Sequence, residues 1–299
     1  MQEYPIKVII KALNISKRAY LYNLNSDKRV REKDIEKALI NCFHTNKGNY
    51  GRPRLKIALS AEGINISEGK IARILKENNL VAKAGRNRKP KKYRKTEQQI
   101  LQENLLLSKD MTNLKVNEVW SSDITEFTTR SGKLYLAGVL DAASRRLMGF
   151  HIASNMKQDI VHQAIKMALF NIEDPRGIVF HSDRGSQYTS NATQKLLKDN
   201  GIISSMSRPG KPNDNQVIES LWNTMKTEIG SVSSFQRSEV TSKLYEHAGD
   251  YYNNKRIHSG ISYLTPMQAY EILNKGVPTL SPEMIIQDAE HPIKDASHS

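Results

Sequence analysis

Residues 119–140 read VWSSDITEFTTRSGKLYLAGVL, and this stretch decides the fold. Two runs rich in β-branched, aromatic and aliphatic residues, 119–127 and 134–140, flank the turn signal Ser131-Gly132-Lys133. A connection this short predicts an antiparallel hairpin. A third strand pattern at 146–152 extends the hairpin into a meander.

Beyond the meander, helical and strand patterns alternate. Helices are predicted at 157–172, 190–200 and 215–230, and strands at 178–183 and 202–206. The order β-β-β-α-β-α-β-α predicts an α/β fold, a mixed sheet flanked by helices, over residues 115–275. The prolines and weak periodicity of residues 276–299 predict a loosely packed C-terminal tail.

Upstream of the sheet, residues 1–82 are predicted to be a small all-α region. Two short helices within 5–24 meet at a turn at Asn14-Ile15, with Ser16 capping the second, and further helices are expected at 31–44, 53–61 and after Ser67. Helix, Gly-containing turn and helix in a basic region are typical of helix-turn-helix DNA-binding proteins, although small helical bundles share the pattern. The candidate DNA contacts are Arg52, Arg54, Lys70 and Arg73.

Positive charge is concentrated in the first third of the chain. The whole chain has 45 Lys and Arg against 31 Asp and Glu, a net +14, and residues 1–100 alone carry 24 against 9, a net +15. This asymmetry indicates a polyanion-binding module joined to a near-neutral domain. Residues 83–114 are predicted to be a basic linker, either a solvated tether or a contact to the DNA backbone, with candidate contacts Arg86, Arg88, Lys91 and Lys92.

Several classes of protein are excluded by composition. Cys42 is the single cysteine, so a disulfide framework or a cysteine-rich zinc site is impossible, and we expect Cys42 to be a core residue. The sequence has no run of 18 apolar residues, and its N-terminus lacks the pattern of a signal peptide. We therefore expect a cytoplasmic protein, near DNA, with no membrane partner.

Three carboxylates stand where a charge needs compensation. Asp123 lies within the first strand, Asp183 ends an apolar strand, and Glu219 lies on the last predicted helix. Phosphodiester cleavage builds up negative charge, which two divalent cations roughly 3.5–4 Å apart stabilise. Mg²⁺ or Mn²⁺ prefers such oxygen ligands, and no His/Cys cluster favours zinc. The sequence thus predicts a catalytic site with two metal ions.

Each carboxylate also has a purely structural explanation. Asp123 could pair with a buried arginine, Asp183 could bond Arg184 or nearby backbone N–H groups, and Glu219 could be a surface charge. Two further carboxylates compete for the catalytic role. We predict that Asp141 caps a turn and that strand alternation places Glu126 opposite Asp123.

Five segments carry a resemblance to a known family: WSSDIT (120–125), LYLAGVLDAASRR (134–146), HSDRGSQYTS (181–190), DNQVIESLWNTMKTE (214–228) and YNNKRIHSGISYLTP (252–266). Together they closely resemble the downstream-frame product of the insertion-sequence-three family of transposases, which shares its core with retroviral integrases. Asp183 and Glu219 have 35 residues between them, which is the spacing of that family's Asp-Asp-(35)-Glu triad.

The resemblance implies a ribonuclease-H-like core and metal ligation by Asp123, Asp183 and Glu219. It implies DNA transposition, in which metal-activated water frees a 3′-hydroxyl that attacks another strand, usually forming a circle first. The implied partners are double-stranded DNA, as terminal inverted repeats and target, and further copies of the chain on that DNA. In that family an upstream-frame product supplies a terminus-binding helix-turn-helix and a zipper, so the chain is either fused to or works with such a product, or it acts alone.

The resemblance also bears on residues outside the triad. Lys226, two helical turns after Glu219, is either a contact to transposon-end DNA or a solvated lysine. Arg256 lies in a polar cluster after the core, and we count it among the DNA contacts. Leu221 and Trp222 are predicted to pack in the core. The alternatives to a transposase are a non-catalytic DNA-binding regulator and a structure-specific nuclease on the same fold.

Overall fold

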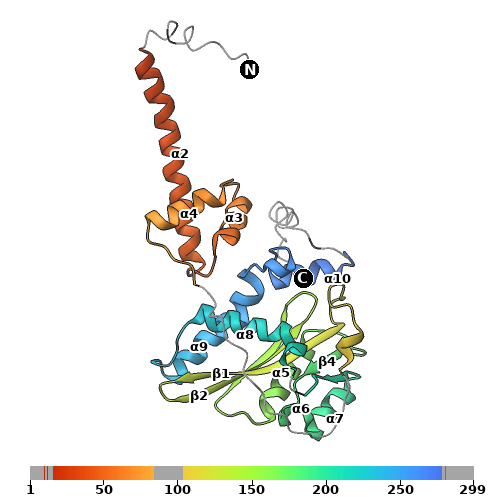
Figure 1. Ribbon diagram of the computed structural model, residues 1–299. Helices are drawn as coiled ribbons and strands as arrows, with labels where there is room; N and C mark the ends of the chain where they lie inside the picture. The colour runs from red at the N-terminus through yellow and green to blue at the C-terminus, as the bar shows by residue number, and fades with distance from the viewer. Residues whose placement is uncertain are drawn as a thin grey trace, which may run out of the picture. The chain divides into compact units, whose positions relative to one another are not determined.

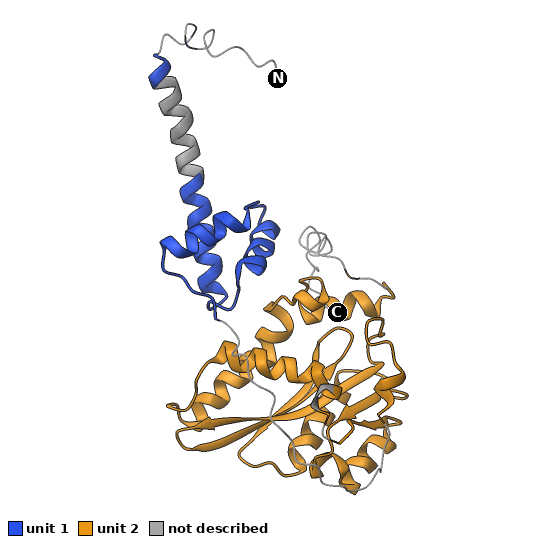
Figure 2. Cartoon of the chain, in the orientation of Figure 1, with its two compact units in different colours: residues 1–83 blue, residues 84–299 orange. Residues whose placement is uncertain are grey.

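The computed structural model describes residues 16–83, 104–209 and 211–277 together with Ile10, Ala12 and Leu280, apart from the side chains of 19–31 and 212–213. The chain forms two compact units, residues 1–83 and 84–299, shown in Figure 2. Each unit has its own core. In the described part of the chain, no helix is long and apolar enough to cross a membrane.

The first unit is helical, as predicted. It contains α2 (Lys17–Thr45), α3 (Arg52–Ala61) and α4 (Glu68–Glu77). The prediction of separate helices ending near 24 and starting near 31 was wrong, because α2 runs through that stretch without a break. Residues 25–30 contain neither Gly nor Pro, so no residue there interrupts a helix. The predicted turn at Asn14-Ile15 lies outside the described residues.

Apolar side chains from all three helices form the core of the first unit. Fully or nearly fully buried are Leu39, Cys42, Phe43, Leu55, Leu59, Ile71, Ile74 and Leu75. The burial of Cys42 confirms its prediction as a core residue. Pro53 stands in the first turn of α3, where the missing N–H costs no hydrogen bond. Ser67 caps α4 by accepting a hydrogen bond from the Lys70 N–H.

The second unit is built on a five-stranded sheet with the order β3-β2-β1-β4-β5. The predicted meander is confirmed: β1 (Val119–Thr129), β2 (Gly132–Asp141) and β3 (Leu147–Ala153) are antiparallel. The strands β4 (Val179–Ser182) and β5 (Ile203–Met206) extend the sheet in parallel with β1. The sheet is therefore mixed, as the order of elements indicated.

Helices cover both faces of this sheet (Figure 1). One core cluster joins Trp120, Val139 and Phe180 to residues of α5 (Asp159–Phe170) and α7 (Asn191–Asp199), with α6 (Ser186–Thr189) beside them. The other joins Phe127, Leu136 and Leu140 to α8 (Gln216–Ile229), α9 (Arg237–Glu246) and the π-helix η3 (His247–Lys255). The sequence did not predict α9, η3 or α10 (Pro266–Asn274).

One side chain of the π-helix η3 forms two hydrogen bonds with the edge strand β3. The Leu147 N–H donates to Asn253 Oδ1 at 2.9 Å, and Asn253 Nδ2 donates to the Leu147 carbonyl at 2.9 Å. One amide side chain thus satisfies both backbone groups of the first residue of β3.

The predicted basic linker ends earlier than residue 114. The short 3-10 helix η1 (Leu105–Ser108) and the residues after it pack on the sheet unit, where Leu105, Leu106, Met111 and Leu114 surround Val119 and Val179. The Leu105 N–H also donates to Ser205 Oγ at 3.0 Å. The predicted boundary at 114 was wrong, because these apolar side chains find a core to bury against. Residues 84–103, with Arg86, Arg88, Lys91 and Lys92, lie outside the described residues.

Close contact between β3 and α5 depends on Gly149. A Cβ at this position would lie 2.5 Å from the backbone nitrogen of Ala168 and would also clash with the Ala164 carbonyl oxygen. Backbone atoms cannot swing aside as a side chain can, so only glycine fits here.

We expect Gly149→Ala to destabilise the second unit by about 1–3 kcal/mol or more, because the added methyl forces β3 and α5 apart. Gly260→Ala is the matched control, since a Cβ there meets no atom within 4 Å. Thermal unfolding of both variants measures the difference, and equal melting temperatures would contradict the prediction.

Candidate active site

The three predicted catalytic carboxylates line a single pocket. Asp123, Asp183 and Glu219 share this pocket of about 500 Å³ with the basic residues Arg184, Arg208 and Lys211. The sheet register explains the meeting of the two aspartates, because Ser121 of β1 pairs with His181 of β4 in parallel. Asp123 lies two residues after Ser121 in β1, and Asp183 lies two residues after His181, just beyond the end of the neighbouring strand β4. The helix α8 packs on β1 and brings Glu219 to the same place.

Asp123 is the most strongly perturbed of the three. Burial, followed by the neighbouring Asp183 and then Glu219, raises its pKa to about 7. Two hydrogen bonds oppose this rise in pKa, one from the Ile124 N–H and one from Trp222 Nε1, which donates to Asp123 Oδ2 at 3.0 Å. Burial and the two nearby carboxylates thus favour the protonated form of Asp123.

Asp183 and Glu219 are perturbed in the same direction. The Asp183 side chain is exposed by surface area, yet enough protein surrounds its carboxylate for desolvation to raise its pKa. The Gly185 N–H donates to Asp183 Oδ1 at 2.9 Å and opposes the shift. Burial also raises the pKa of Glu219, which is half-buried on α8. All three groups are therefore harder to ionise here than in water.

The donor set fits a divalent cation. All three side chains offer carboxylate oxygens, which Mg²⁺ and Mn²⁺ prefer, and a cation would relieve the repulsion that raises the pKa of Asp123. Among the described residues, none of the three takes part in an ion pair with Arg or Lys. In the same part of the chain, no three His, Cys, Asp or Glu side chains stand close enough to hold one ion in their present positions. Joint ligation by the three would therefore require their side chains to close on the ion.

The two competing carboxylates have structural roles, as predicted. Asp141 is fully buried and accepts hydrogen bonds from the Asn117 N–H, the Ser144 N–H and Ser144 Oγ at 2.6–2.9 Å. Glu126 forms an ion pair with Lys133 at 3.0 Å. The β1–β2 register continues without a bulge from Trp120 to Thr129, so Glu126 and Asp123 point to opposite faces of the sheet.

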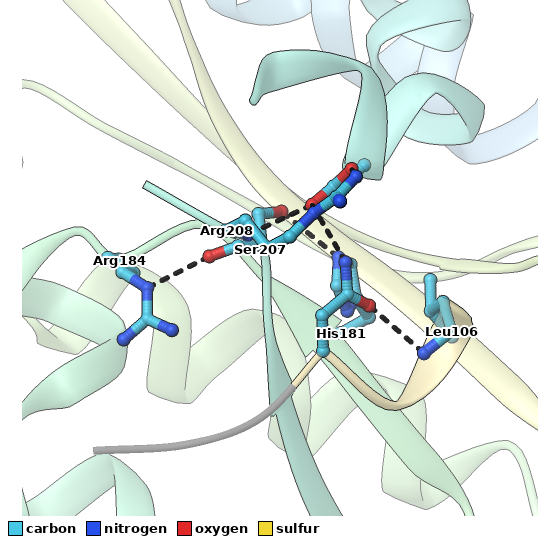
Figure 3. A network of polar contacts seen from close by, with 7 residues as sticks. Leu106, His181, Arg184, Ser207 and Arg208 are labelled. Carbon is cyan, nitrogen blue, oxygen red and sulfur yellow. Dashed lines mark hydrogen bonds and ion pairs between the residues drawn. The ribbon is translucent and has the colours of Figure 1, made fainter. Parts of the chain in front are cut away.

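A network of polar contacts borders the pocket, and Arg184, Ser207 and Arg208 belong to both (Figure 3). The ring of His181, which has no exposed surface, lies between Ser205 Oγ at 2.9 Å and Ser207 Oγ at 3.0 Å. Burial lowers the pKa of His181 to about 4, so the imidazole is neutral at pH 7. The Ser207 carbonyl accepts a hydrogen bond from Arg184 Nε at 2.9 Å, which links the network to the pocket wall.

A second part of the same network holds the chain between β5 and α8. Asp214 accepts hydrogen bonds from Arg208 Nε and Nη2 at 3.0 and 2.9 Å and from Asn104 Nδ2 at 2.8 Å. These bonds hold the pKa of Asp214 near 2. Sequence reasoning missed this network, although the histidine two positions before Asp183 was a signal of it.

The candidate DNA contacts that the structure describes differ in their surroundings. Arg52 and Arg73 are exposed, and Arg73 lies 3.8 Å from Glu77. Lys70 lies 3.7 Å from Glu32, and Arg54 lies over the Tyr50 ring at 5.9 Å. In the second unit, Lys226 is half-buried on α8 with its Nζ 5.5 Å from the centre of the Phe127 ring.

Arg256 is an exception that corrects the sequence analysis. Its side chain is 3 % exposed, and Arg256 Nε donates to Glu228 Oε1 at 2.7 Å. His247 Nε2 lies 2.9 Å from the other oxygen of Glu228. The guanidinium therefore fastens η3 to α8 inside the protein and does not face DNA. The motif alone could not show this, because the partner glutamate lies 28 residues away.

Trp222 and Leu221 are buried, which confirms that they pack in the core. The hydrogen bond from the Trp222 indole to Asp123 was not predicted.

The fold and site together define a class of protein. The mixed sheet of order β3-β2-β1-β4-β5, flanked by helices, has a ribonuclease-H-like fold, with carboxylates on β1, after β4 and on α8.

Comparison with known proteins gives the family. Residues 113–212 and 200–266 match two integrase core domain families, and residues 29–89 match an HTH-like domain. The chain is 33 % identical to the transposase for insertion sequence element IS904 of Lactococcus lactis, over 81 % of this chain and 95 % of that protein. It is 30 % identical to the transposase InsF for IS3A of Escherichia coli, over 89 % and 94 % respectively. The chain belongs to the insertion-sequence-three family of transposases.

Among solved structures, the chain is similar to the catalytic core domain of the HTLV-2 integrase in complex with magnesium. The match covers 53 % of this chain and 99 % of the integrase domain. The sequence identity is 15 % and the TM-score is 0.41.

We expect Arg256→Ala to destabilise the protein by about 3–5 kcal/mol, because it leaves Glu228 buried without its cationic partner. Arg176→Ala is the control, since Arg176 and Asp174 form an exposed pair at 2.7 Å, a kind of contact worth about 0–1 kcal/mol. Denaturant unfolding compares the two variants. A loss no larger for Arg256→Ala than for Arg176→Ala would contradict the buried role.

We expect the stability of the metal-free protein to fall as the pH rises from 5 to 8. The pKa of Asp123 is about 7 in the folded protein against an ordinary 3.8, so the folded state binds the proton more tightly than the unfolded state. Ionising Asp123 in this window therefore costs stability. Asp123→Asn should show a weaker pH dependence in thermal unfolding with a chelator present. Parallel curves for variant and wild type would argue against the shift.

Proposed function

We propose that this chain is a transposase that cuts DNA strands and joins the freed 3′-hydroxyl to another strand, using Asp123, Asp183 and Glu219 with two Mg²⁺ or Mn²⁺ ions. The observation that carries the proposal is the shared pocket, in which three carboxylates from distant parts of the chain meet with no Arg or Lys paired to them among the described residues. Membership of the insertion-sequence-three family supports it.

The chemistry of the bound metal would be to activate the attacking oxygen and to stabilise the charge on the phosphate. The residues of the chain would bind the metal ions and orient the DNA phosphates. Asp123 on β1, Asp183 just after β4 and Glu219 on α8 would supply the oxygen ligands. Lys211 and Arg184, on the wall of the same pocket, suit contact with phosphates flanking the reacting bond. His181, neutral and buried, keeps the ends of β4 and β5 in place.

The first unit is the proposed DNA-binding region. The match of residues 29–89 to an HTH-like domain and the exposed Arg52 and Arg73 support contact with terminal inverted repeats. We propose that residues 1–82 bind DNA, that the basic stretch after them contacts the backbone, that residues from about 104 to 275 form the catalytic core, and that 276–299 form a tail. Several copies of the chain would assemble on the DNA, either alone or with the upstream-frame product.

We expect Asp183→Asn to reduce strand cleavage and joining by roughly 100-fold or more, because the variant loses a charged metal ligand. The assay uses labelled duplex carrying the terminal repeats that flank the gene, with Mg²⁺ and a target duplex. Asp174→Asn is the matched control, because Asp174 is an exposed aspartate paired with Arg176.

The products of this assay separate the competing functions. A transposase joins strands, a structure-specific nuclease nicks without joining, and a regulator binds the duplex in wild type and variant alike without cutting. Equal activity of Asp183→Asn and wild type would refute the proposed site.

A further inference from the structure

One aromatic side chain connects two of the three candidate ligands. Trp222 lies on α8 three residues after Glu219, one helical turn further on, and is 4 % exposed. Its indole Nε1 donates to Asp123 Oδ2 at 3.0 Å, across 99 residues of sequence. The helix that carries one carboxylate therefore holds the strand that carries another.

The sheet provides space for this indole at one position. Gly138 of β2 is the residue paired with Asp123 of β1 in the antiparallel register. A Cβ on Gly138 would lie 2.7 Å from Trp222 Cη2, closer than real Cβ contacts, and 3.1 Å from Cζ2, which is tighter than most. The six-membered ring of Trp222 thus lies directly over Gly138, beside the carboxylate to which its N–H donates.

The hydrogen bond does more than satisfy a buried N–H group. Buried tryptophan needs an acceptor for its indole nitrogen, and an uncharged carbonyl would meet that need. Here the acceptor is an acidic side chain in the pocket, and the bond holds one of its two oxygens in place. Side chains that orient metal ligands in this way strengthen metal binding, because the ligand does not have to be ordered when the ion arrives.

We propose that Trp222 is a positioning residue for metal binding: it fixes Asp123 Oδ2 and ties Asp123 to the helix of Glu219. Gly138 is the second part of this device, because it admits the indole ring. The inference rests on the proposed function, since it concerns the metal site of that function. It assigns Trp222 a role beyond its place in the core.

The chain offers a matched control. Trp120 is also fully buried in the second unit, and its Nε1 donates to Asn117 Oδ1 at 3.2 Å. It belongs to the core cluster of the α5 face, whereas Trp222 belongs to the cluster of the α8 face. Trp222→Phe and Trp120→Phe therefore each remove one buried indole N–H and a similar volume. Only Trp222 donates its hydrogen bond to a residue that lines the pocket.

The experiment measures metal binding by the full-length chain, without relying on activity. Free Mn²⁺ is followed by electron paramagnetic resonance during titration, with and without a duplex oligonucleotide. We expect the Kd for Mn²⁺ to rise about 10-fold in Trp222→Phe, the lower range for the loss of a ligand-orienting contact. Trp120→Phe should bind as wild type does. Thermal unfolding of both variants establishes that they are folded and comparably stable.

Two further readouts test the same contact. With Mg²⁺, the fluorescence of Trp120→Phe, in which Trp222 is the remaining tryptophan, should change on titration, whereas that of Trp222→Phe should stay constant. Gly138→Ala should weaken Mn²⁺ binding in the same direction as Trp222→Phe, because the added methyl displaces the ring without altering any carboxylate.

The outcomes are distinct. Wild-type affinity in Trp222→Phe, or an equal loss in Trp120→Phe, would overturn the inference and leave the proposed function standing. A wild-type protein that binds no Mn²⁺, with or without DNA, would overturn the proposed function and this inference with it.

Discussion

Repulsion among carboxylates in a partly desolvated pocket is the constraint on which this structure depends. Burying Asp123 beside Asp183 and Glu219 is unfavourable in the absence of a cation, because burial first, and then the two neighbouring carboxylates, raise its pKa to about 7. The rest of the second unit keeps the three groups together despite it. The parallel β1–β4 register places the two aspartates side by side, the buried Glu228–Arg256 pair fastens α8 to η3, and His181 with its two serines holds the ends of β4 and β5.

The sequence predicted the sheet well because its signals are local. Alternation of apolar and polar residues and the turn at Ser131-Gly132-Lys133 are readable within a few residues, and the structure has the predicted strands with small shifts at their ends. The three carboxylates were identifiable for a related reason, since a charge at the edge of an apolar strand stands out. That they line one pocket depends on strand order, which the resemblance to a known family supplied and periodicity alone did not.

The features that the sequence did not reveal are those that join distant parts of the chain. The bond from Trp222 to Asp123 spans 99 residues, and that from Arg256 to Glu228 spans 28, so neither leaves a local pattern. Arg256 was taken for a DNA contact because a polar motif surrounds it, and only its partner shows that it is interior. The packing of Leu105 and Leu106 was overlooked because a basic, proline-containing stretch precedes them. The break expected in α2 assumed a boundary that no Gly or Pro marks.

The contact of Asn253 with Leu147 has a consequence for how copies of this protein behave beside one another. The strand β3 lies at the border of the sheet, and a border strand with unpaired backbone groups invites another chain to add a strand and aggregate. Asn253 occupies the donor and the acceptor of Leu147, as a neighbouring strand would. At that end of β3, Asn253 takes the place of a neighbouring strand, so a second copy of the protein does not find unpaired backbone groups of Leu147 on which to add a strand.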